Sequence, residues 1–352
     1  MFEGKSVAVV VPCYNEQTQI GGVLRTMPEM VDCVIVVDDK STDGTADVVR
    51  GHIASEGDSP RTVLIEHEQN AGVGAAIVTG YREAIRREMD VTAVMAGDGQ
   101  MDPNELDVIV APVARGLADY TKGNRLFYRG AWETIPRHRY LGNAFLSMLT
   151  KIASGYWHVA DSQTGYTGIS LAALQTVDLE GIYPRYGYPN DMLVRLNVYG
   201  FRVADVPIRP VYSVGEQSKM KLWKVVPTMS WMIFKRFLWR LKEKYVIHDF
   251  HPLVMFYAFG FLTFWIGLLF GLYLFVHRVF FGPVAGTSTL FSVFLFMTGL
   301  QLQLFAMWFD MEMNRDLRVQ LPAEAQASAP EGGEPTGGAG GSDEGQTGGR
   351  TP

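Results

Sequence analysis

The chain has 352 residues and a formal net charge of −6, and 47% of its residues are hydrophobic. This length exceeds that of one average domain, so we expect more than one structural region. Outside an acidic C-terminal tail the chain is nearly neutral, which argues against a basic surface for nucleic acid and predicts no nucleic-acid partner.

Composition changes along the chain and divides it into four regions. Residues 1–215 have the mixed composition of a globular domain, residues 216–250 are basic, residues 251–310 are strongly apolar, and residues 311–352 form a tail. From about residue 322 the tail lacks aromatic and large aliphatic side chains, so it cannot offset its ordering entropy and we expect disorder. Five acidic residues and one arginine in this stretch account for four of the six net negative charges.

The first hundred residues alternate apolar runs with stretches of helical periodicity. The apolar runs cover residues 6–11, 33–38, 62–67 and 91–96, and a helical pattern covers residues 71–87. This alternation predicts an α/β domain with a mostly parallel, doubly wound sheet and helices on both faces. Ligands of such sheets bind beyond the carboxyl ends of the strands.

Polar and turn-forming residues follow the ends of all four predicted strands, where we expect them to converge on one nucleotide site. They are Pro12, Tyr14, Asn15 and Glu16 after the first strand, Asp38 and Asp39 at the second, Asn70 and Gly72 after the third, and Asp98 after the fourth. Tyr14 is suited to stack on a base, and the carboxylates are suited to accept from ribose or base donors. Turn chemistry is the alternative for Tyr14 and Asn15, and close approach of a neighbouring helix is the alternative for Gly72.

The segment AGDGQMDP after the fourth strand is the candidate metal site. Asp98 is followed by Gln100 and Asp102 at two-residue spacing. Mg²⁺ and Mn²⁺ take oxygen ligands, usually one or two carboxylates together with phosphate oxygens and water. The segment therefore predicts a divalent cation on Asp98 and Gln100 that is shared with a diphosphate, with Asp102 as a further candidate. A strand that ends in an Asp-Gly turn is the alternative.

Four motifs in this order, VVVPCYNE, VVDDKSTDGT, NAGVGAA and AGDGQMDP, resemble the nucleotide-sugar half of the family 2 glycosyltransferases of GT-A fold. The resemblance covers about residues 5–220 and is strongest to the dolichol-phosphate mannosyltransferase-like branch, which loads a sugar onto a polyprenyl phosphate. It implies that the residues at the first two strand ends line the nucleotide pocket. Family members commonly carry Asp-x-Asp where this chain has Ala96-Gly97-Asp98, so the first carboxylate is missing. The resemblance implies metal dependence without tight metal binding in the absence of substrate.

The same resemblance implies an acceptor site for a lipid phosphate. Arg125 in KGNRL and Arg139 in RYLGN match the two arginines that grip the acceptor phosphate, and Asn143 lies one helical turn after Arg139. Lys219 in EQSKMKLWK matches a basic element that reaches a phosphate, and Asp161 in ADSQTGYTGIS borders the acceptor cleft, where it would orient an arginine or a sugar hydroxyl. A solvated basic face is the alternative for the two arginines, and an ordinary membrane-proximal lysine is the alternative for Lys219.

Asn190 and Asp191 in GYPNDMLVRL lie at a helix start, where family members with hydroxyl acceptors often carry the general base. A phosphate acceptor is already mostly ionised near neutral pH and needs no strong base. We therefore expect Asp191 either to hold a sugar hydroxyl or to be favoured by the helix dipole. The candidate catalytic residues are Asp98, Arg125, Arg139 and Asp191.

Two stretches near the C-terminus are long and apolar enough to cross a membrane. Residues 252–276 and 284–309 contain no charged residue, and each can span about 30 Å as a helix. A short connector makes them a hairpin, and buried core helices are the alternative. Basic residues gather before the first stretch and place residues 1–250 and both termini in the cytoplasm, at a cell membrane crossed twice. These residues are Lys219, Lys221, Lys224, Lys235, Arg236, Arg240, Lys242 and Lys244.

The basic segment itself has helical periodicity. Trp231, Phe234, Leu238, Leu241 and Tyr245 recur every three or four residues beside lysines and arginines. The pattern predicts an amphipathic helix at the level of the lipid headgroups. An amphipathic helix packed on the globular domain is the alternative.

Together these features predict a membrane-anchored enzyme that moves a sugar from a nucleotide sugar to a dolichyl or undecaprenyl phosphate with inversion. A non-catalytic membrane protein that binds a nucleotide sugar or a lipid is the alternative raised by Ala96. A processive polysaccharide synthase would carry a Gln-x-x-Arg-Trp element, which is missing. UDP-glucose, UDP-N-acetylglucosamine and GDP-mannose all fit the motifs, but mannosyl enzymes usually have DADLQHP in place of AGDGQMDP, which favours a UDP-sugar. The sequence leaves the oligomeric state and the lipid length open.

Overall fold

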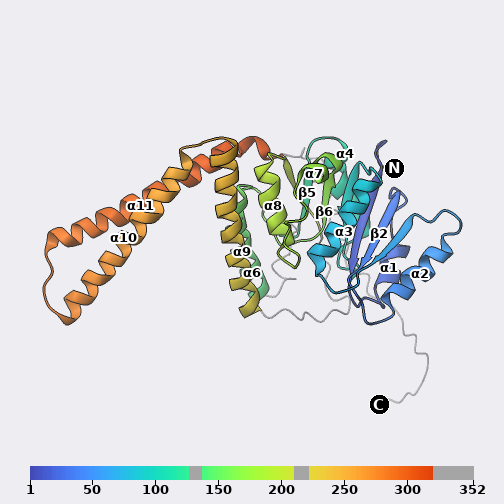
Figure 1. The fold of residues 1–352 in the computed structure, drawn as a ribbon, viewed down its shortest axis with the longest axis horizontal. Coiled ribbons are helices and arrows are strands. Elements are labelled where there is room, and N and C mark those ends of the chain that lie inside the picture. The colour runs from blue at the N-terminus through green and yellow to red at the C-terminus, as the bar shows by residue number, and fades with distance from the viewer. Residues whose placement is uncertain (127–136, 210–221, 320–352) are drawn as a thin grey trace, which may run out of the picture.

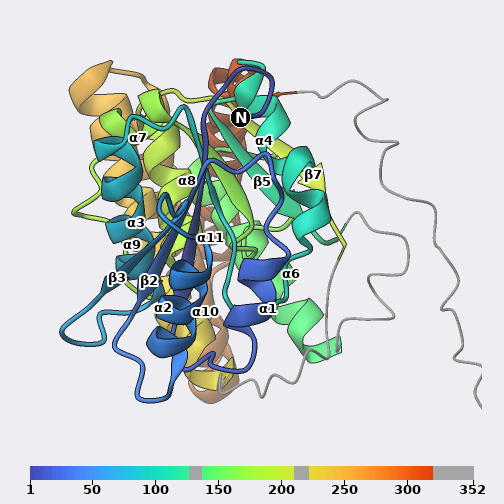
Figure 2. The same cartoon turned by 90° about the vertical axis from the view of Figure 1, so that its right-hand side faces the viewer.

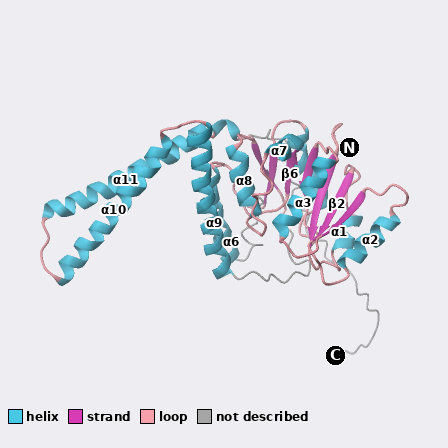
Figure 3. Ribbon diagram, viewed as in Figure 1, coloured by secondary structure: helices cyan, strands magenta, loops and turns pink. Residues whose placement is uncertain are grey.

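A seven-stranded sheet forms the centre of the N-terminal domain (Figures 1 and 3). The computed structural model describes residues 1–126, 137–209 and 222–319, without the side chains of residues 137–141 and 222–224. The strand order is β3-β2-β1-β4-β6-β5-β7, and β6 runs antiparallel to its neighbours β4 and β5, whereas the other neighbouring pairs are parallel. The predicted mostly parallel sheet is thus confirmed. The strands are β1 Val7–Cys13, β2 Cys33–Asp38, β3 Thr62–Glu66, β4 Val91–Val94, β5 Tyr120–Asn124, β6 Thr167–Ser170 and β7 Val203–Pro207.

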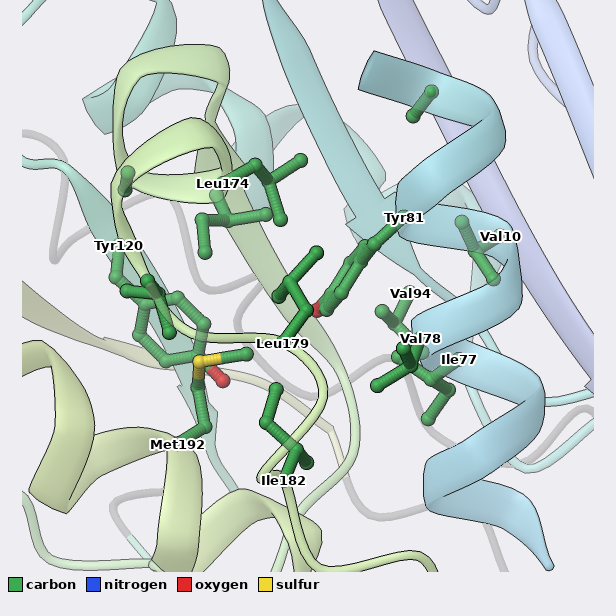
Figure 4. Close-up of a cluster of buried hydrophobic side chains, with 14 of the residues drawn as sticks. Val10, Ile77, Val78, Tyr81, Val94, Tyr120, Leu174, Leu179, Ile182 and Met192 are labelled. Carbon is green, nitrogen blue, oxygen red and sulfur yellow. The ribbon is translucent and has the colours of Figure 1, made fainter. Parts of the chain in front are cut away.

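Helices cover both faces of the sheet, as its continuous apolar strands require (Figure 2). One face packs against α1 Ile20–Arg25, α2 Thr45–Ser55 and α4 Leu106–Ala114, and the other against α3 Val73–Arg86, α7 Leu171–Thr176 and α8 Tyr188–Val198. Successive residues of β1 alternate between the two cores, since Ala8 and Val10 belong to one and Val7 and Val9 to the other. Figure 4 shows the α3 side, where Tyr81 points into the space between the sheet and α7.

Two longer helices pack side by side against α8 at the edge of the domain. They are α6 Arg137–Ser154 and α9 Leu222–Lys242, and α9 continues into the π-helical turn η2 Glu243–His248. Leu146 of α6, Val194 of α8 and Met229, Met232 and Ile233 of α9 share one apolar cluster. Two short 3-10 helices are also present, η1 Pro103–Glu105 and η3 Arg315–Leu317.

The amphipathic helix predicted for the basic segment exists, but its apolar residues do not all lie on one exposed face. Trp231, Phe234 and Leu238 are exposed on α9, as expected for side chains that contact lipid. Leu241 and Tyr245 are instead buried against the start of the next helix. These two residues pack inside the protein because α9 continues into η2, which leads into α10. The placement of the helix at the lipid headgroups stays a prediction.

The C-terminal helices α10 Leu253–Phe280 and α11 Gly286–Met313 form a hairpin that projects from the domain (Figure 1). Each is long and apolar enough to cross a membrane, with mean hydropathies of 2.1 and 1.7 over the best window, and each is mostly unburied. A core helix of a globular protein would be mostly buried, so the membrane interpretation is the better one. The helices approach closely at Gly267 and Gly299, where a Cβ would overlap the backbone of the opposite helix.

A buried ion pair joins α9 to the end of the hairpin. Nη1 and Nη2 of Arg240 each lie 2.9 Å from a carboxylate oxygen of Asp310, and both side chains are fully buried. Tyr245 donates to the same carboxylate at 2.6 Å. Lys244 donates to the backbone carbonyl of Asn197, at the end of α8, at 3.0 Å.

The basic residues predicted before the first span therefore lie partly inside the protein. Arg236, Arg240 and Lys244 make contacts within the protein, and among the described side chains of this basic cluster only Lys235 and Lys242 are exposed. The sequence could not separate the internal from the exposed basic residues, because both kinds occur in one continuous helical segment. Lys219, Lys221, the side chain of Lys224 and the predicted disordered tail from about residue 322 lie outside the description.

Candidate active site

The carboxyl ends of β4 and β5 lie at the same edge of the sheet and carry Asp98 and Arg125. Both strands run antiparallel to β6, which separates them, so they point the same way. Neighbouring strands are about 4.8 Å apart, which puts β4 and β5 about 10 Å apart. Tyr166, just before β6, links the two strand ends, because its carbonyl accepts from the Gly123 amide of β5 at 2.9 Å and its hydroxyl donates to the Asp102 carbonyl at 3.0 Å. This spacing suits a diphosphate and a sugar lying between the two side chains.

The loop after β1 is held in shape by the loop after β2. Asn15 has a left-handed φ of 57°, and its side-chain oxygen accepts from the Thr42 amide at 2.8 Å. The Glu16 amide donates to the Thr45 hydroxyl at 2.9 Å, and the Glu16 carboxylate packs against Gly97. Pro12 is buried within β1, whereas Tyr14 is 46% exposed at the sheet edge. The loop is thus fixed by hydrogen bonds and leaves Tyr14 exposed after β1.

Asp38 and Asp39 are nearly fully buried and bind the protein's own loops. Asp38 accepts from the amide and the hydroxyl of Ser41. Asp39 accepts from the amides of Ala71 at 2.8 Å and Gly72 at 2.7 Å. These bonds shape both loops at the sheet edge, and direct contact of either carboxylate with a nucleotide stays a prediction.

His67 lies among the candidate site residues, although the sequence analysis did not select it. Its Nδ1 lies 2.8 Å from the Asp39 carboxylate and its Nε2 lies 2.9 Å from the Thr79 hydroxyl. Asn70 donates to the backbone carbonyl of Asp39 at 3.1 Å. The available signal was the position of His67 immediately after β3, at the edge where the other site residues gather.

Gly72 has a φ of 98° and caps α3 where another chain segment passes very close. A Cβ on Gly72 would lie 2.5 Å from the carbonyl oxygen of Pro184, and this carbonyl accepts from the Ala75 amide at 3.1 Å. Glycine is therefore required here for two reasons: a Cβ would overlap the Pro184 backbone, and the positive φ is strained for other residues. Contact with a nucleotide is not needed to explain it.

Asp98 is largely enclosed, and burial raises the pKa of its carboxyl group. Its Oδ1 accepts from the Gln100 amide at 3.0 Å. Asp102 instead caps η1 by accepting from the Asn104 amide at 2.9 Å. Among the residues that the structure describes, no group of three or more acidic, His or Cys side chains is placed to hold a metal. The residues fit a cation that arrives with a diphosphate, since such a cation needs only one or two protein ligands.

Arg125 is fixed by a forked ion pair with Asp161. Its Nε lies 2.7 Å and its Nη2 3.2 Å from the two carboxylate oxygens. Burial alone would raise the pKa of Asp161, but the charge and hydrogen bonds of Arg125, with the charge of Lys122, hold this pKa below its usual value. The ion pair orients the guanidinium, and the Arg125 side chain remains 23% exposed. This is the arrangement that an anion-binding arginine needs.

Two buried charged residues that the sequence analysis did not predict, Lys122 and Asp205, lie near the Arg125–Asp161 pair. Lys122 is fully buried in β5 and donates to the Thr164 carbonyl at 2.6 Å. Burial lowers the pKa of Lys122 to about 8 and raises the pKa of Asp205 in β7 to about 7. Asp205 accepts from Asn124 at 2.7 Å. These groups support the strand end from which Arg125 projects.

Asn190 and Asp191 begin α8 and are both buried. The side-chain oxygen of Asn190 accepts from Thr150 of α6 at 2.9 Å and from Gln163 at 3.0 Å, which places it beside the Asp161 segment. The Asp191 carboxylate lies 2.7 Å from Nε of Arg236 in α9. Asp191 therefore faces α9, a contact that no motif in the sequence indicates.

The remaining acceptor-site candidates belong to α6 or lie outside the description. Asn143 is half-buried and one helical turn before Ser147, whose hydroxyl accepts from the Ser162 amide at 3.2 Å. This face of α6 therefore points toward the segment that holds Arg125. Arg139 lies in the first turn of α6 with its side chain outside the description, and Lys219 lies outside the described residues.

Comparisons with known proteins identify the family and the fold. Residues 8–177 match the model of glycosyl transferase family 2. An undecaprenyl-phosphate mannosyltransferase of Micrococcus luteus is 30% identical over 219 residues, which cover 61% of this chain and 87% of that protein. The chain belongs to glycosyltransferase family 2. The enzyme predicted from the sequence is thus confirmed at the level of the family.

Further relatives of this family 2 glycosyltransferase differ in the sugar that they transfer. A UDP-N-acetylglucosamine–dolichyl-phosphate N-acetylglucosaminyltransferase of Methanococcus voltae is 27% identical, over 59% of this chain and 87% of that protein. A polyprenol monophosphomannose synthase of Mycolicibacterium smegmatis is 29% identical, over 57% and 75%. Glucosyl-3-phosphoglycerate synthase from Mycobacterium tuberculosis, solved with Mn²⁺ and UDP, shares the fold at 20% identity with a TM-score of 0.50, over 67% and 80%. The predicted GT-A fold is confirmed.

Proposed function

We propose that this glycosyltransferase moves a sugar from a nucleotide sugar to a polyprenyl phosphate, with inversion at the anomeric carbon. The observation that carries the proposal is the position of Arg125, oriented by Asp161 and accessible, at the same sheet edge as Asp98. The names of three relatives include a polyprenyl or dolichyl phosphate or a polyprenol product, which supports a lipid phosphate as the acceptor.

In this proposal the protein's main task is to bring two anions together. Arg125, whose side chain is partly exposed, binds the acceptor phosphate, with Arg139, Asn143 and Lys219 as further donors. A phosphate oxygen forms the new bond to the anomeric carbon while the bond from that carbon to the nucleotide diphosphate breaks. The acceptor is already ionised, so no side chain has to remove a proton. Holding both substrates in line makes the step effectively unimolecular.

The donor would occupy the ends of β1, β2, β3 and β4. Tyr14 would stack on the base, and Asp98 and Gln100 would hold a Mg²⁺ or Mn²⁺ ion together with the diphosphate. When bound, the cation would neutralise the charge that develops on the leaving diphosphate. UDP-glucose and UDP-N-acetylglucosamine are the donors that we favour over GDP-mannose, because AGDGQMDP departs from the mannosyl pattern.

The lipid acceptor requires the site to face a membrane. The α10–α11 hairpin would cross the bilayer and return, which leaves the domain and both termini on the cytoplasmic side. The exposed apolar residues of α9 would lie at the headgroups, next to α6 and the arginine site.

The test is sugar transfer by the full-length protein in detergent or lipid nanodiscs. Radiolabelled UDP-glucose, UDP-N-acetylglucosamine and GDP-mannose are each supplied with a polyprenyl phosphate, with and without a chelator. Asp98→Asn should lower the rate by about a hundredfold, the usual cost of one group that stabilises developing charge. Asp102→Asn is the matched control and should retain activity, because an asparagine can still cap η1.

A non-catalytic regulator is the second candidate, which Ala96 favours because the first metal carboxylate is missing. Good binding of a nucleotide sugar with no lipid product from any donor would support the regulator and refute the enzyme.

A further inference from the structure

Two arginines one turn apart on α9 contact different parts of the protein. Arg240 pairs with Asp310 at the end of the hairpin, and Arg236 reaches into the catalytic domain. Residues at this spacing lie on the same side of a helix. The membrane-proximal helix is thus attached at neighbouring points to the hairpin and to the domain.

Arg236 ends on a fully buried carboxylate. Its Nε lies 2.7 Å from Oδ1 of Asp191, and its Nη2 donates to Oδ2 at 3.0 Å and to the Gly181 carbonyl at 2.7 Å. Arg195 of α8 lies 3.4 Å from the same Oδ1, and the ring of Trp239 lies within 6.0 Å of both guanidinium groups. A buried carboxylate is stable only while its cationic partners remain in place.

The Asp191 carboxylate in turn fixes the segment that contacts the donor loop. Its Oδ2 accepts from the Tyr183 amide at 2.7 Å. The next residue, Pro184, accepts from the Ala75 amide at 3.1 Å and lies against Gly72. A continuous series of contacts therefore runs from α9 through Asp191 to the loop predicted to bind the nucleotide.

We propose that Arg236 is a positioning residue that links the placement of α9 at the membrane to the geometry of the donor loop, residues 70–75. Loss of Arg236 leaves Asp191 with Arg195 as its remaining ion-pair partner, which weakens the hold on Tyr183 and Pro184. The amides of the donor loop then lose a fixed neighbour, and donor binding suffers more than acceptor binding. The meaning of this link for catalysis rests on the proposed function.

The experiment compares Arg236→Gln with Lys235→Gln in the full-length protein in nanodiscs. Both variants remove one positive charge from adjacent positions of α9, but Lys235 is exposed and lies over Trp231 on the outer face. Amide hydrogen exchange is measured over residues 70–76 and 181–185, and the KM values for nucleotide sugar and polyprenyl phosphate are measured separately.

In Arg236→Gln we expect faster exchange in both segments and a donor KM raised about tenfold, which corresponds to about 1.4 kcal/mol. The acceptor KM should change less than twofold or so, and Arg236→Lys should recover part of the donor affinity because it keeps the charge. Lys235→Gln should leave exchange and donor KM unchanged. If Arg236→Gln is too unstable to purify, Asp191→Asn serves instead and should give the same pattern.

Unchanged exchange over residues 70–76 in Arg236→Gln would overturn the link. Faster exchange in this variant with an unchanged donor KM would also overturn it. The same holds if Lys235→Gln changes exchange and donor KM as much as Arg236→Gln does. The exchange measurement needs no turnover, so a wild-type protein that makes no sugar lipid would refute the proposed function without deciding the link.

Discussion

The Arg240–Asp310 pair offers a direct test of how the hairpin is attached to the domain. Both side chains are fully buried, and two hydrogen bonds of 2.9 Å join them. Asp310→Ala leaves the Arg240 charge buried without its carboxylate, which typically costs about 3–5 kcal/mol. The total stability of a domain is only about 5–15 kcal/mol, so we expect a large loss.

The assay is reversible denaturation of the full-length protein in detergent micelles. Arg240→Met combined with Asp310→Leu removes both charges and should recover most of the loss, because apolar replacement of a buried pair is often neutral. Arg315→Ala is the control, since Arg315 and Glu312 form a pair at 3.4 Å with exposures of 75% and 63%. That variant should change stability by less than about 0.5 kcal/mol. The reasoning is refuted if Asp310→Ala behaves like the control or if the double variant is no more stable than the single one.

Two further predictions concern the domain itself. Gly80→Ala in α3 would push a Cβ to within 2.8 Å of Val10 Cγ2, so thermal denaturation should report a loss of about 1–3 kcal/mol. Gly51→Ala in α2 meets no atom within 4 Å and should stabilise by about 0.5–1 kcal/mol, and equal effects would contradict this packing. Burial raises the pKa of Asp205 to about 7 from 3.8, so the stability that its protonation contributes is lost as the pH rises through about 7. The Tm of the wild type minus that of Asp205→Asn should therefore fall between about pH 4 and 8, and a flat difference would contradict the raised pKa.

The N-terminal half of the sheet was predictable because its strands are continuous apolar runs. Residues 33–38 coincide with β2, while β1 extends further than predicted and β4 ends earlier. The strands β5 to β7 were not predicted. Lys122 lies fully buried in β5, and Asp205 lies in β7, so neither strand shows the apolar pattern of a buried strand. Their polar groups are satisfied by tertiary hydrogen bonds that no local pattern reveals.

The candidate site was predictable where motifs mark strand ends and was not where distant residues meet. Asp98 and Arg125 follow β4 and β5, so topology alone brings them to one edge. The pairing of Asp191 with Arg236 joins residues 45 positions apart on two helices, and it depends on how α9 packs on α8. For the same reason the sequence predicts Arg236 and Arg240 as part of a basic cluster at the membrane, although both make contacts inside the protein.

The packing of α9 bears on how a lipid acceptor would reach Arg125. One side of α9 packs on α6 and α8, and another side exposes Trp231, Phe234 and Leu238. An exposed apolar side next to a hairpin long enough to span a bilayer is stabilised when it enters the headgroup region. That placement would turn the α6–α9 edge of the domain toward the membrane. Since Ser147 and Thr150 of α6 contact the segments that carry Asp161 and Asn190, the arginine site would lie at the lipid surface, within reach of a phosphate whose tail stays in the bilayer.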